Sequence, residues 1–129
     1  HRGHLYRAIL EGIAMEQSLA TKAVELATGE RTEEFAVIGG GAKSELWCQI
    51  IADTSSKKVL NMSSDEASSL GAGISAAVAA GWFPSFEEAA KSMVHVKGIT
   101  EPITRNAERY RNQLIIYRKI YPAIREISK

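Results

Sequence analysis

A short apolar segment that ends in three glycines constrains the fold of this chain more than any other feature. Residues 35–38 (Phe-Ala-Val-Ile) form a continuous apolar run, which is typical of a strand buried on both faces. Gly39, Gly40 and Gly41 follow at once, and residues 44–53 then place apolar side chains on one helical face. The sequence therefore predicts a strand, a glycine turn and a helix. Three consecutive glycines cost chain entropy on folding, so the turn needs either positive φ values or a close approach that Cβ atoms would block.

The remaining elements follow from periodicity and from residues that start or stop helices. Apolar spacing predicts a helix over residues 4–27, which Gly29 ends, and a second short strand over residues 58–61. A capping box at residues 63–66 (Ser-Ser-Asp-Glu) opens a third helix that runs to about Ala80 and is ended by Gly81. A short helix over residues 85–93 and a loop around Pro102 come next. The last helix carries one apolar stripe, which Pro122 should kink or end, formed by Tyr110, Leu114, Tyr117, Tyr121 and Ile124.

This order of elements predicts an α/β fold, with mostly helices around a short parallel sheet. Two strands are fewer than a sheet usually contains, and both look buried, so they need neighbours that the sequence does not supply. We therefore expect residues 1–129 to be part of a larger domain. The alternative is that a second copy of the chain provides the missing edge, which would make the protein a homo-oligomer.

Composition narrows the class of protein. The chain has 129 residues, which suits one domain, and its formal net charge is +1 without a basic stripe, so we expect no nucleic-acid partner. The longest stretch of low polarity, residues 70–83, is too short to span a bilayer, so we expect no membrane association. A single cysteine, Cys48, cannot form an internal disulfide, which favours a reducing, cytoplasmic location.

The glycine turn suits a nucleotide. Backbone N–H groups at the start of the following helix are unpaired and the helix dipole is positive there, so a phosphate, or the ribose and adenine of a nucleotide, can lie on the turn. Two known glycine loops are excluded, because Ala42 replaces the last glycine of the Walker motif and Ser44 replaces the third glycine of the dinucleotide fingerprint. A structural strand–helix turn remains the alternative at this point. Charge–dipole attraction supplies about 0.3–1 kcal/mol, whereas micromolar binding takes about 8 kcal/mol. The turn can therefore be only part of an ATP site.

Four segments, in order, resemble the C-terminal domain of the FGGY carbohydrate kinases. The first looks like the closing half of a family signature, the second like the adenosine motif and its helix, the third like the alanine-rich helix, and the fourth like the C-terminal helix with its tyrosines. Together they extend over nearly the whole chain and cover residues 4–12, 39–53, 66–81 and 110–122.

The resemblance implies an actin-like ATPase (ribonuclease H-like) fold in which this chain is the C-terminal, nucleotide-binding part of a sugar kinase. Such an enzyme transfers the γ-phosphoryl group of ATP to a sugar or polyol hydroxyl. The catalytic base, the Mg²⁺ ligands and the sugar-binding domain are expected in segments that this chain lacks, so the chain alone is expected to be inactive. The nucleotide contacts are expected at Gly40, Gly41, Ala42, Ser44 and Glu45.

Within that set, the resemblance places Gly40, Gly41 and Ala42 under the adenine and ribose, with the Gly41 amide near a phosphate. Glu45 stands where the family often has an asparagine that contacts adenine. The second functional hypothesis, a non-catalytic actin-like module that binds a nucleotide or a partner, stays open.

Other polar and glycine residues have simpler interpretations. Asp53 is expected to be a surface carboxylate, although its place at the end of a helix also suggests a specific partner. Glu11 is interpreted as an exposed helix charge or a signature residue, and Glu66 as a capping residue. Gly71 and Gly73 lie in a helix, so we expect them to pack against the glycine turn or its nucleotide. The two tryptophans, Trp47 and Trp82, are expected in the core or at a domain interface.

Overall fold

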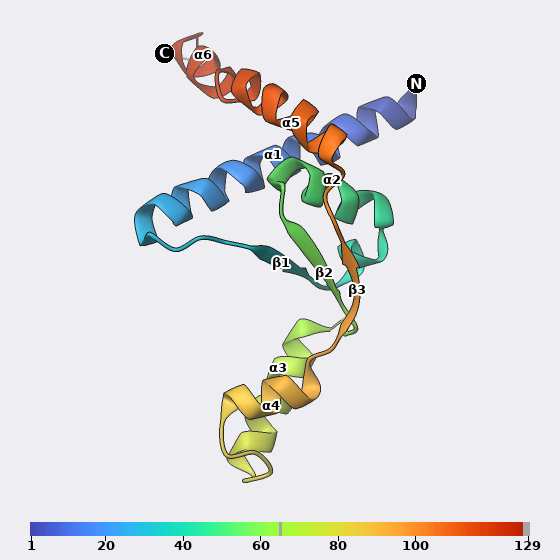
Figure 1. Ribbon diagram of the computed structural model, residues 1–129, viewed down its shortest axis with the longest axis vertical. Coiled ribbons are helices and arrows are strands. Elements are labelled where there is room, and N and C mark those ends of the chain that lie inside the picture. The colour runs from blue at the N-terminus through green and yellow to red at the C-terminus, as the bar shows by residue number, and fades with distance from the viewer. Residues whose placement is uncertain (65, 128–129) are drawn as a thin grey trace.

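The computed structural model describes residues 1–64 and 66–127, so Asp65 of the expected capping box lies outside the described residues. Helices and strands follow each other in a mixed order along the chain (Figure 1). They are α1 (Arg2–Thr28), β1 (Glu34–Val37), the 3₁₀ turn η1 (Gly40–Lys43), α2 (Glu45–Ser55), β2 (Lys58–Met62), α3 (Ala67–Ala79), α4 (Phe86–Met93), β3 (Val96–Thr100), α5 (Thr104–Tyr117) and α6 (Ile120–Ile127). The predicted α/β class is confirmed.

The sheet has three strands in the order β1-β2-β3. β1 and β2 are parallel, with Phe35 opposite Val59, whereas β3 runs antiparallel to β2. The sheet is therefore mixed, which corrects the prediction of a wholly parallel sheet with two strands. The pattern missed β3 because residues 96–100 include an exposed lysine and a glycine, as an edge strand with one neighbour can.

Helix α2 covers one face of the sheet. Cys48, Ile51 and Ala52 of α2 pack on Val59 of β2, and Phe35 and Val37 of β1 join this cluster. The alternate residues of β1 are exposed, so the prediction that this strand is buried on both faces is wrong for the chain by itself. On the opposite side of the sheet Ala36 and Ile99 are exposed.

Helix α1 crosses α5 and packs on it through a second cluster (Figure 1). Met15, Tyr110 and Leu114 are buried together, with Leu19 and Tyr117 around them. α1 ends where the sequence predicts, because Gly29 adopts the left-handed conformation that a C-terminal glycine allows (φ 74°).

The C-terminal helix is broken in two, as Pro122 predicts. The break between α5 and α6 lies at residues 118–119, because the ring of a proline clashes with the carbonyl four residues earlier, here that of Arg118. The expected core stripe is confirmed on α5, whereas Tyr121 and Ile124 of α6 are exposed.

Helices α3 and α4 pack on each other and project from one edge of the sheet (Figure 1). α3 begins at Ala67, later than the capping box predicts, and the Ser64 hydroxyl instead accepts the N–H of Glu66. A Cβ on Gly73 would lie 3.6 Å from Cε of Met93 in α4, and one on Gly71 would meet nothing within 4 Å. These glycines therefore pack on α4 or face outward, which corrects the expected contact with the glycine turn, whereas the expected contact with a nucleotide stays a prediction. Trp82, at the far end of α3, is exposed rather than buried in the core.

Asp53 is buried, which corrects its interpretation as a surface residue. Its side chain is 2% exposed and accepts three hydrogen bonds. Oδ1 accepts from Gln49 (2.8 Å) and from the backbone N–H of Ile103 (2.7 Å), and Oδ2 accepts from Asn106 (2.8 Å). Because Ile103 precedes the first residue of α5, this carboxylate joins the end of α2 to the start of α5.

Within residues 1–64 and 66–127, no helix combines the length and the apolar character that crossing a membrane requires.

Candidate functional site

The glycine turn is compact and lies at the carboxyl end of β1. Gly39 has φ 83°, and the chain then makes one turn of 3₁₀ helix closed by two backbone hydrogen bonds. The Ala42 N–H donates to the Gly39 carbonyl and the Ser44 N–H to the Gly41 carbonyl, each at 3.1 Å. Gly39 is the residue of this turn whose positive φ favours glycine.

Gly40 and Gly41 have ordinary φ values, so their lack of a side chain needs another reason. Both residues are exposed. A Cβ on Gly40 would meet no atom within 4 Å, and one on Gly41 would lie 3.3 Å from Cδ1 of Trp47. A side chain at position 41 would therefore be tight against Trp47, whereas the described residues leave space for one at position 40. An open backbone at Gly40 leaves room for the close approach of another molecule.

The start of α2 supplies polar groups beside the turn. The Ser44 hydroxyl caps the helix by accepting the N–H of Trp47 at 3.3 Å. Glu45 is exposed in the first turn of the helix, where its charge interacts well with the helix dipole. That same negative charge opposes a phosphate at this terminus and suits hydrogen-bond donors, such as amino and hydroxyl groups.

A buried thiol on α2 contacts the backbone of the glycine turn. Cys48 is fully buried and lies 3.7 Å from the Ala42 carbonyl, to which its Sγ can donate. Burial raises the pKa of the Cys48 thiol, so it stays protonated and packs as a small apolar group.

The topology brings the turn close to the start of α3. β1 and β2 are parallel, so their carboxyl ends meet at one edge of the sheet. The glycine turn follows β1 at this edge, and Ser63 and Ser64 follow β2, with α3 continuing outward (Figure 1). Open α/β sheets bind ligands outside the carboxyl ends of their strands. All five predicted residues (Gly40, Gly41, Ala42, Ser44 and Glu45) thus lie together at the edge where such a site is expected.

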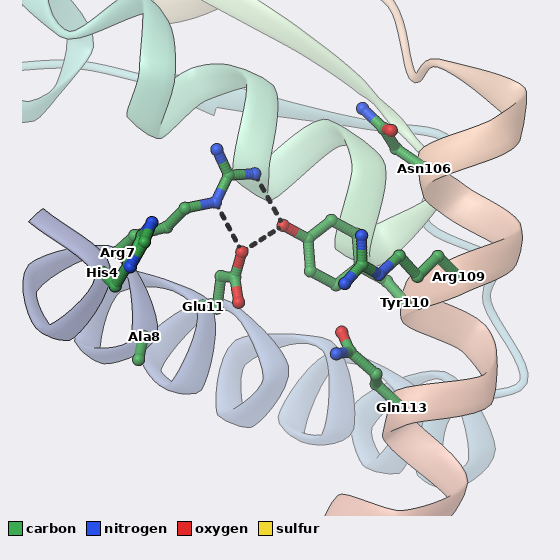
Figure 2. Close-up of a pocket in the computed structure, with 8 residues that line it drawn as sticks. All are labelled: His4, Arg7, Ala8, Glu11, Asn106, Arg109, Tyr110 and Gln113. Carbon is green, nitrogen blue, oxygen red and sulfur yellow. Dashed lines mark hydrogen bonds and ion pairs between the residues drawn. The ribbon is translucent and has the colours of Figure 1, made fainter. Parts of the chain in front are cut away.

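A second feature, which the sequence did not indicate, is a polar hollow between α1 and α5 (Figure 2). Its volume is about 420 Å³. No residue of the glycine turn lines it; its walls are formed by His4, Arg7, Ala8, Glu11, Asn106, Arg109, Tyr110 and Gln113.

Three of these side chains form a closed network, drawn with dashed lines in Figure 2. Arg7 Nε donates to Glu11 Oε1 at 2.7 Å, and the Tyr110 hydroxyl donates to the same oxygen at 2.7 Å. Arg7 Nη2 also lies 3.3 Å from the Tyr110 hydroxyl. Glu11 is therefore bound between two helices rather than being a free helix charge.

The network shifts the ionisation of all three groups. Partial burial opposes ionisation of Glu11, but the hydrogen bonds from Arg7 and Tyr110 outweigh it and lower the pKa of this carboxyl. Burial, followed by the hydrogen bond to Glu11, raises the pKa of Tyr110. The hydrogen bond to Glu11 is the largest cause that raises the pKa of Arg7. At neutral pH the site thus contains a carboxylate, a guanidinium and a neutral phenol.

Glu11→Gln is expected to lower the free energy of unfolding by about 1–2 kcal/mol near neutral pH, because two charge-assisted hydrogen bonds are weakened. The folded-state pKa of Glu11 lies below its ordinary value of 4.5, so this stabilisation is complete above about pH 4.5 and is lost as pH falls through the folded-state pKa. Urea unfolding of both proteins, followed from neutral to acid pH, measures the difference. The control is Glu108→Gln, an exposed carboxylate on α5. A difference that stays constant on acidification would contradict this account.

Among the residues that the structure describes, no group of three or more His, Cys, Asp and Glu side chains is arranged to hold a metal ion.

Comparisons with known proteins agree with this fold. A model of the C-terminal domain of the FGGY family of carbohydrate kinases matches residues 1–80. A xylulose kinase of Bacillus subtilis is 30% identical over 130 residues, which cover 99% of this chain and 26% of that protein.

Solved structures give the same result. A xylulose kinase from Rhodospirillum rubrum superposes on 98% of this chain with a TM-score of 0.82 and 26% identity, over 26% of its own length. A gluconate kinase from Lactobacillus acidophilus shares the fold, with a TM-score of 0.85 and 21% identity over 96% of this chain and 25% of its own. The chain spans about a quarter of the length of the relatives that it matches.

Proposed function

The chain belongs to the FGGY family of carbohydrate kinases, to its C-terminal domain, and on this premise we propose that the glycine turn binds the adenosine part of ATP. The observation that carries the proposal is Gly40, an exposed glycine that the described residues do not require. It lies at the carboxyl edge of two parallel strands, where ligands bind in open α/β sheets. The substrate of the whole protein would be a sugar or polyol whose hydroxyl receives the γ-phosphoryl group.

The arrangement of the turn favours the nucleoside over the phosphates. Gly40 and Gly41 present bare backbone, against which a flat base or a ribose can pack. Glu45 can accept a hydrogen bond from the exocyclic amine of adenine or from a ribose hydroxyl, and its charge directs the phosphates away from the start of α2. The Gly41 amide remains the backbone donor that we propose to lie nearest to a phosphate, with Ala42 and Ser44 completing the turn.

Catalysis would require the rest of a longer protein. The base that deprotonates the hydroxyl and the carboxylates that hold Mg²⁺ are proposed to lie outside these 129 residues, so we propose that the chain alone is inactive. The open edge of β1 and the exposed opposite side of the sheet support a larger domain around this one. The contribution of residues 1–129 would be to position the nucleotide, since phosphoryl transfer depends mainly on positioning and electrostatics.

The acceptor is proposed only as a class. The relatives reported above are named xylulose kinase and gluconate kinase, and sugar contacts would lie in the part of the protein beyond this chain. The buried, unpaired Cys48 fits a reducing, cytoplasmic location.

Fluorescence of Trp47 tests the proposed site, because its indole lies beside the backbone of Gly41. Trp82, the other tryptophan of residues 1–129, is exposed and is replaced by phenylalanine, as is any tryptophan in the rest of the protein. In this variant of the intact protein, ATP, ADP and adenosine should each change the Trp47 emission saturably, whereas tripolyphosphate should not. Saturable ATP binding without any change in Trp47 emission would exclude the glycine turn. An effect of tripolyphosphate equal to that of adenosine would place the phosphates, rather than the nucleoside, on the turn.

Phosphorylation of a sugar separates the kinase from the alternative, a nucleotide-binding module without catalysis. If the intact protein binds adenosine on the turn but transfers no phosphoryl group to any sugar or polyol, the alternative is correct.

A further inference from the structure

The hollow between α1 and α5 has an uncompensated positive charge. Two guanidinium groups, those of Arg7 and Arg109, face one carboxylate, that of Glu11, which leaves a formal charge of +1. Glu11 Oε1 already accepts from Arg7 and from Tyr110. Arg109, by contrast, makes no hydrogen bond or ion pair with the residues that the structure describes; its charge helps to lower the pKa of Glu11 across the hollow, and it is exposed at the rim. Its planar set of N–H donors is suited to an oxyanion.

The same hollow contains an acceptor without a donor. Gln113 Oε1 is buried, and it has no hydrogen-bond partner within residues 1–64 and 66–127. Buried carbonyl oxygens in proteins are nearly always paired, because an unpaired one has lost its water without compensation. Gln113 lies one helical turn after Arg109 on α5, so both side chains line the same wall (Figure 2).

From these two features we propose that the hollow binds a small phosphate ester that carries a free hydroxyl group. Arg109, with the remaining donors of Arg7, binds the phosphate oxygens, and the Gln113 side chain, whose Oε1 is buried in the empty hollow, turns toward the ligand to accept the hydroxyl. A volume of about 420 Å³ lies within the usual range for small-molecule sites. A simple carboxylate would satisfy the arginines but would leave Gln113 unpaired. This inference goes beyond the nucleotide function and does not depend on it, because no residue of the glycine turn takes part.

The probe for this site is glycerol 2-phosphate, compared with inorganic phosphate and with acetate, in calorimetric titrations of the intact protein. Glycerol 2-phosphate should bind saturably and more tightly than acetate. Arg109→Gln should weaken its binding about tenfold, because a charge-assisted pair of hydrogen bonds is lost. The matched control is Arg111→Gln, an exposed arginine of the same helix that does not line the hollow, and it should bind as the wild type does.

Two further variants separate the parts of the proposal. Gln113→Leu should weaken the binding of glycerol 2-phosphate several-fold and leave that of acetate unchanged, while the exposed neighbour Asn112→Leu should change neither. Gly40→Val alters the glycine turn, so it should leave the binding of glycerol 2-phosphate unchanged. Circular dichroism of each variant verifies that it folds.

Several results would overturn the proposal. They are the absence of saturable binding by the wild type, equal losses in the Arg109 and Arg111 variants, and loss of binding in Gly40→Val. Acetate binding as tight as that of glycerol 2-phosphate would exclude a phosphate ester as the ligand. Because the nucleotide proposal is tested with adenosine and Trp47 fluorescence, failure of either proposal leaves the other one standing.

Discussion

Gly40→Val is expected to weaken the binding of ATP to the intact protein by about 10- to 100-fold, which corresponds to roughly 1–3 kcal/mol of steric cost. The added methyl groups would occupy the space in front of the turn, where we propose that the adenosine packs. The fold itself should not change, because a Cβ at this position meets no atom within 4 Å and the φ of Gly40 is not in the left-handed region. Equilibrium titration with ATP, with circular dichroism as a measure of folding, gives the result.

A graded series makes this prediction sharper. Gly40→Ala should have a smaller effect than Gly40→Val, since the obstruction grows with the side chain. Gly12→Ala is the matched control, because its Cβ also meets nothing within 4 Å but lies on α1, away from the glycine turn. Gly41→Val is less informative, since its side chain would press on Trp47 and could act through α2. Unchanged ATP affinity in both Gly40 variants would remove the turn from the nucleotide site.

Asp53→Ala is expected to lower the free energy of unfolding by about 3–4 kcal/mol, because hydrogen bonds to a buried charged group contribute about 1.5–3 kcal/mol each and do not add fully. The substitution leaves three donors without an acceptor at the junction of α2 and α5: those of Gln49, Ile103 and Asn106. It also removes the acceptor that holds the backbone at the start of α5. The midpoint and slope of urea unfolding measure the loss.

Two variants serve as controls for the Asp53 prediction. Asp53→Asn keeps the shape and one acceptor oxygen, so its loss should be smaller than that of Asp53→Ala. Glu108→Ala removes an exposed carboxylate from α5 and should change stability by less than about 0.5 kcal/mol. If Asp53→Ala were no more destabilising than Glu108→Ala, the buried carboxylate would have no structural role.

The helix ends and turns that are set by residues close together in the sequence were predictable. Gly29 ends α1 through a left-handed conformation, because this signal acts within one helical turn. The helices expected from Ser44 and Ser85 each begin one residue later, and the structure shows both serines as their caps. The glycine turn was predictable for the same reason, since it follows β1 directly in the sequence. The five nucleotide contacts expected there came from the family resemblance and stay a prediction. The strand β3 was not, because an edge strand with exposed residues carries little apolar periodicity.

The polar hollow could not be predicted, because it depends on the angle at which α1 crosses α5. Glu11 and Tyr110 are 99 residues apart, and each side chain has an ordinary place on its own helix. Sequence spacing assigns a residue to a face of its helix, but it does not state which other face will pack against it. The tyrosine stripe predicted that Tyr110 would be buried, and only the packing on Met15 brought its hydroxyl to Glu11.

Local sequence signals were enough to establish the α/β class, the extent of most helices and the place of the glycine turn, because backbone preference and side-chain period are local properties. Only the folded structure shows that Gly39 has a positive φ that favours glycine, and that a Cβ on Gly40 would meet no other atom within 4 Å. It also decided that Asp53 is a buried acceptor and that Arg109 and Gln113 line one hollow. These properties depend on contacts between residues that are distant in the sequence. The side chains become buried, and their hydrogen bonds gain strength, only once the helices have packed.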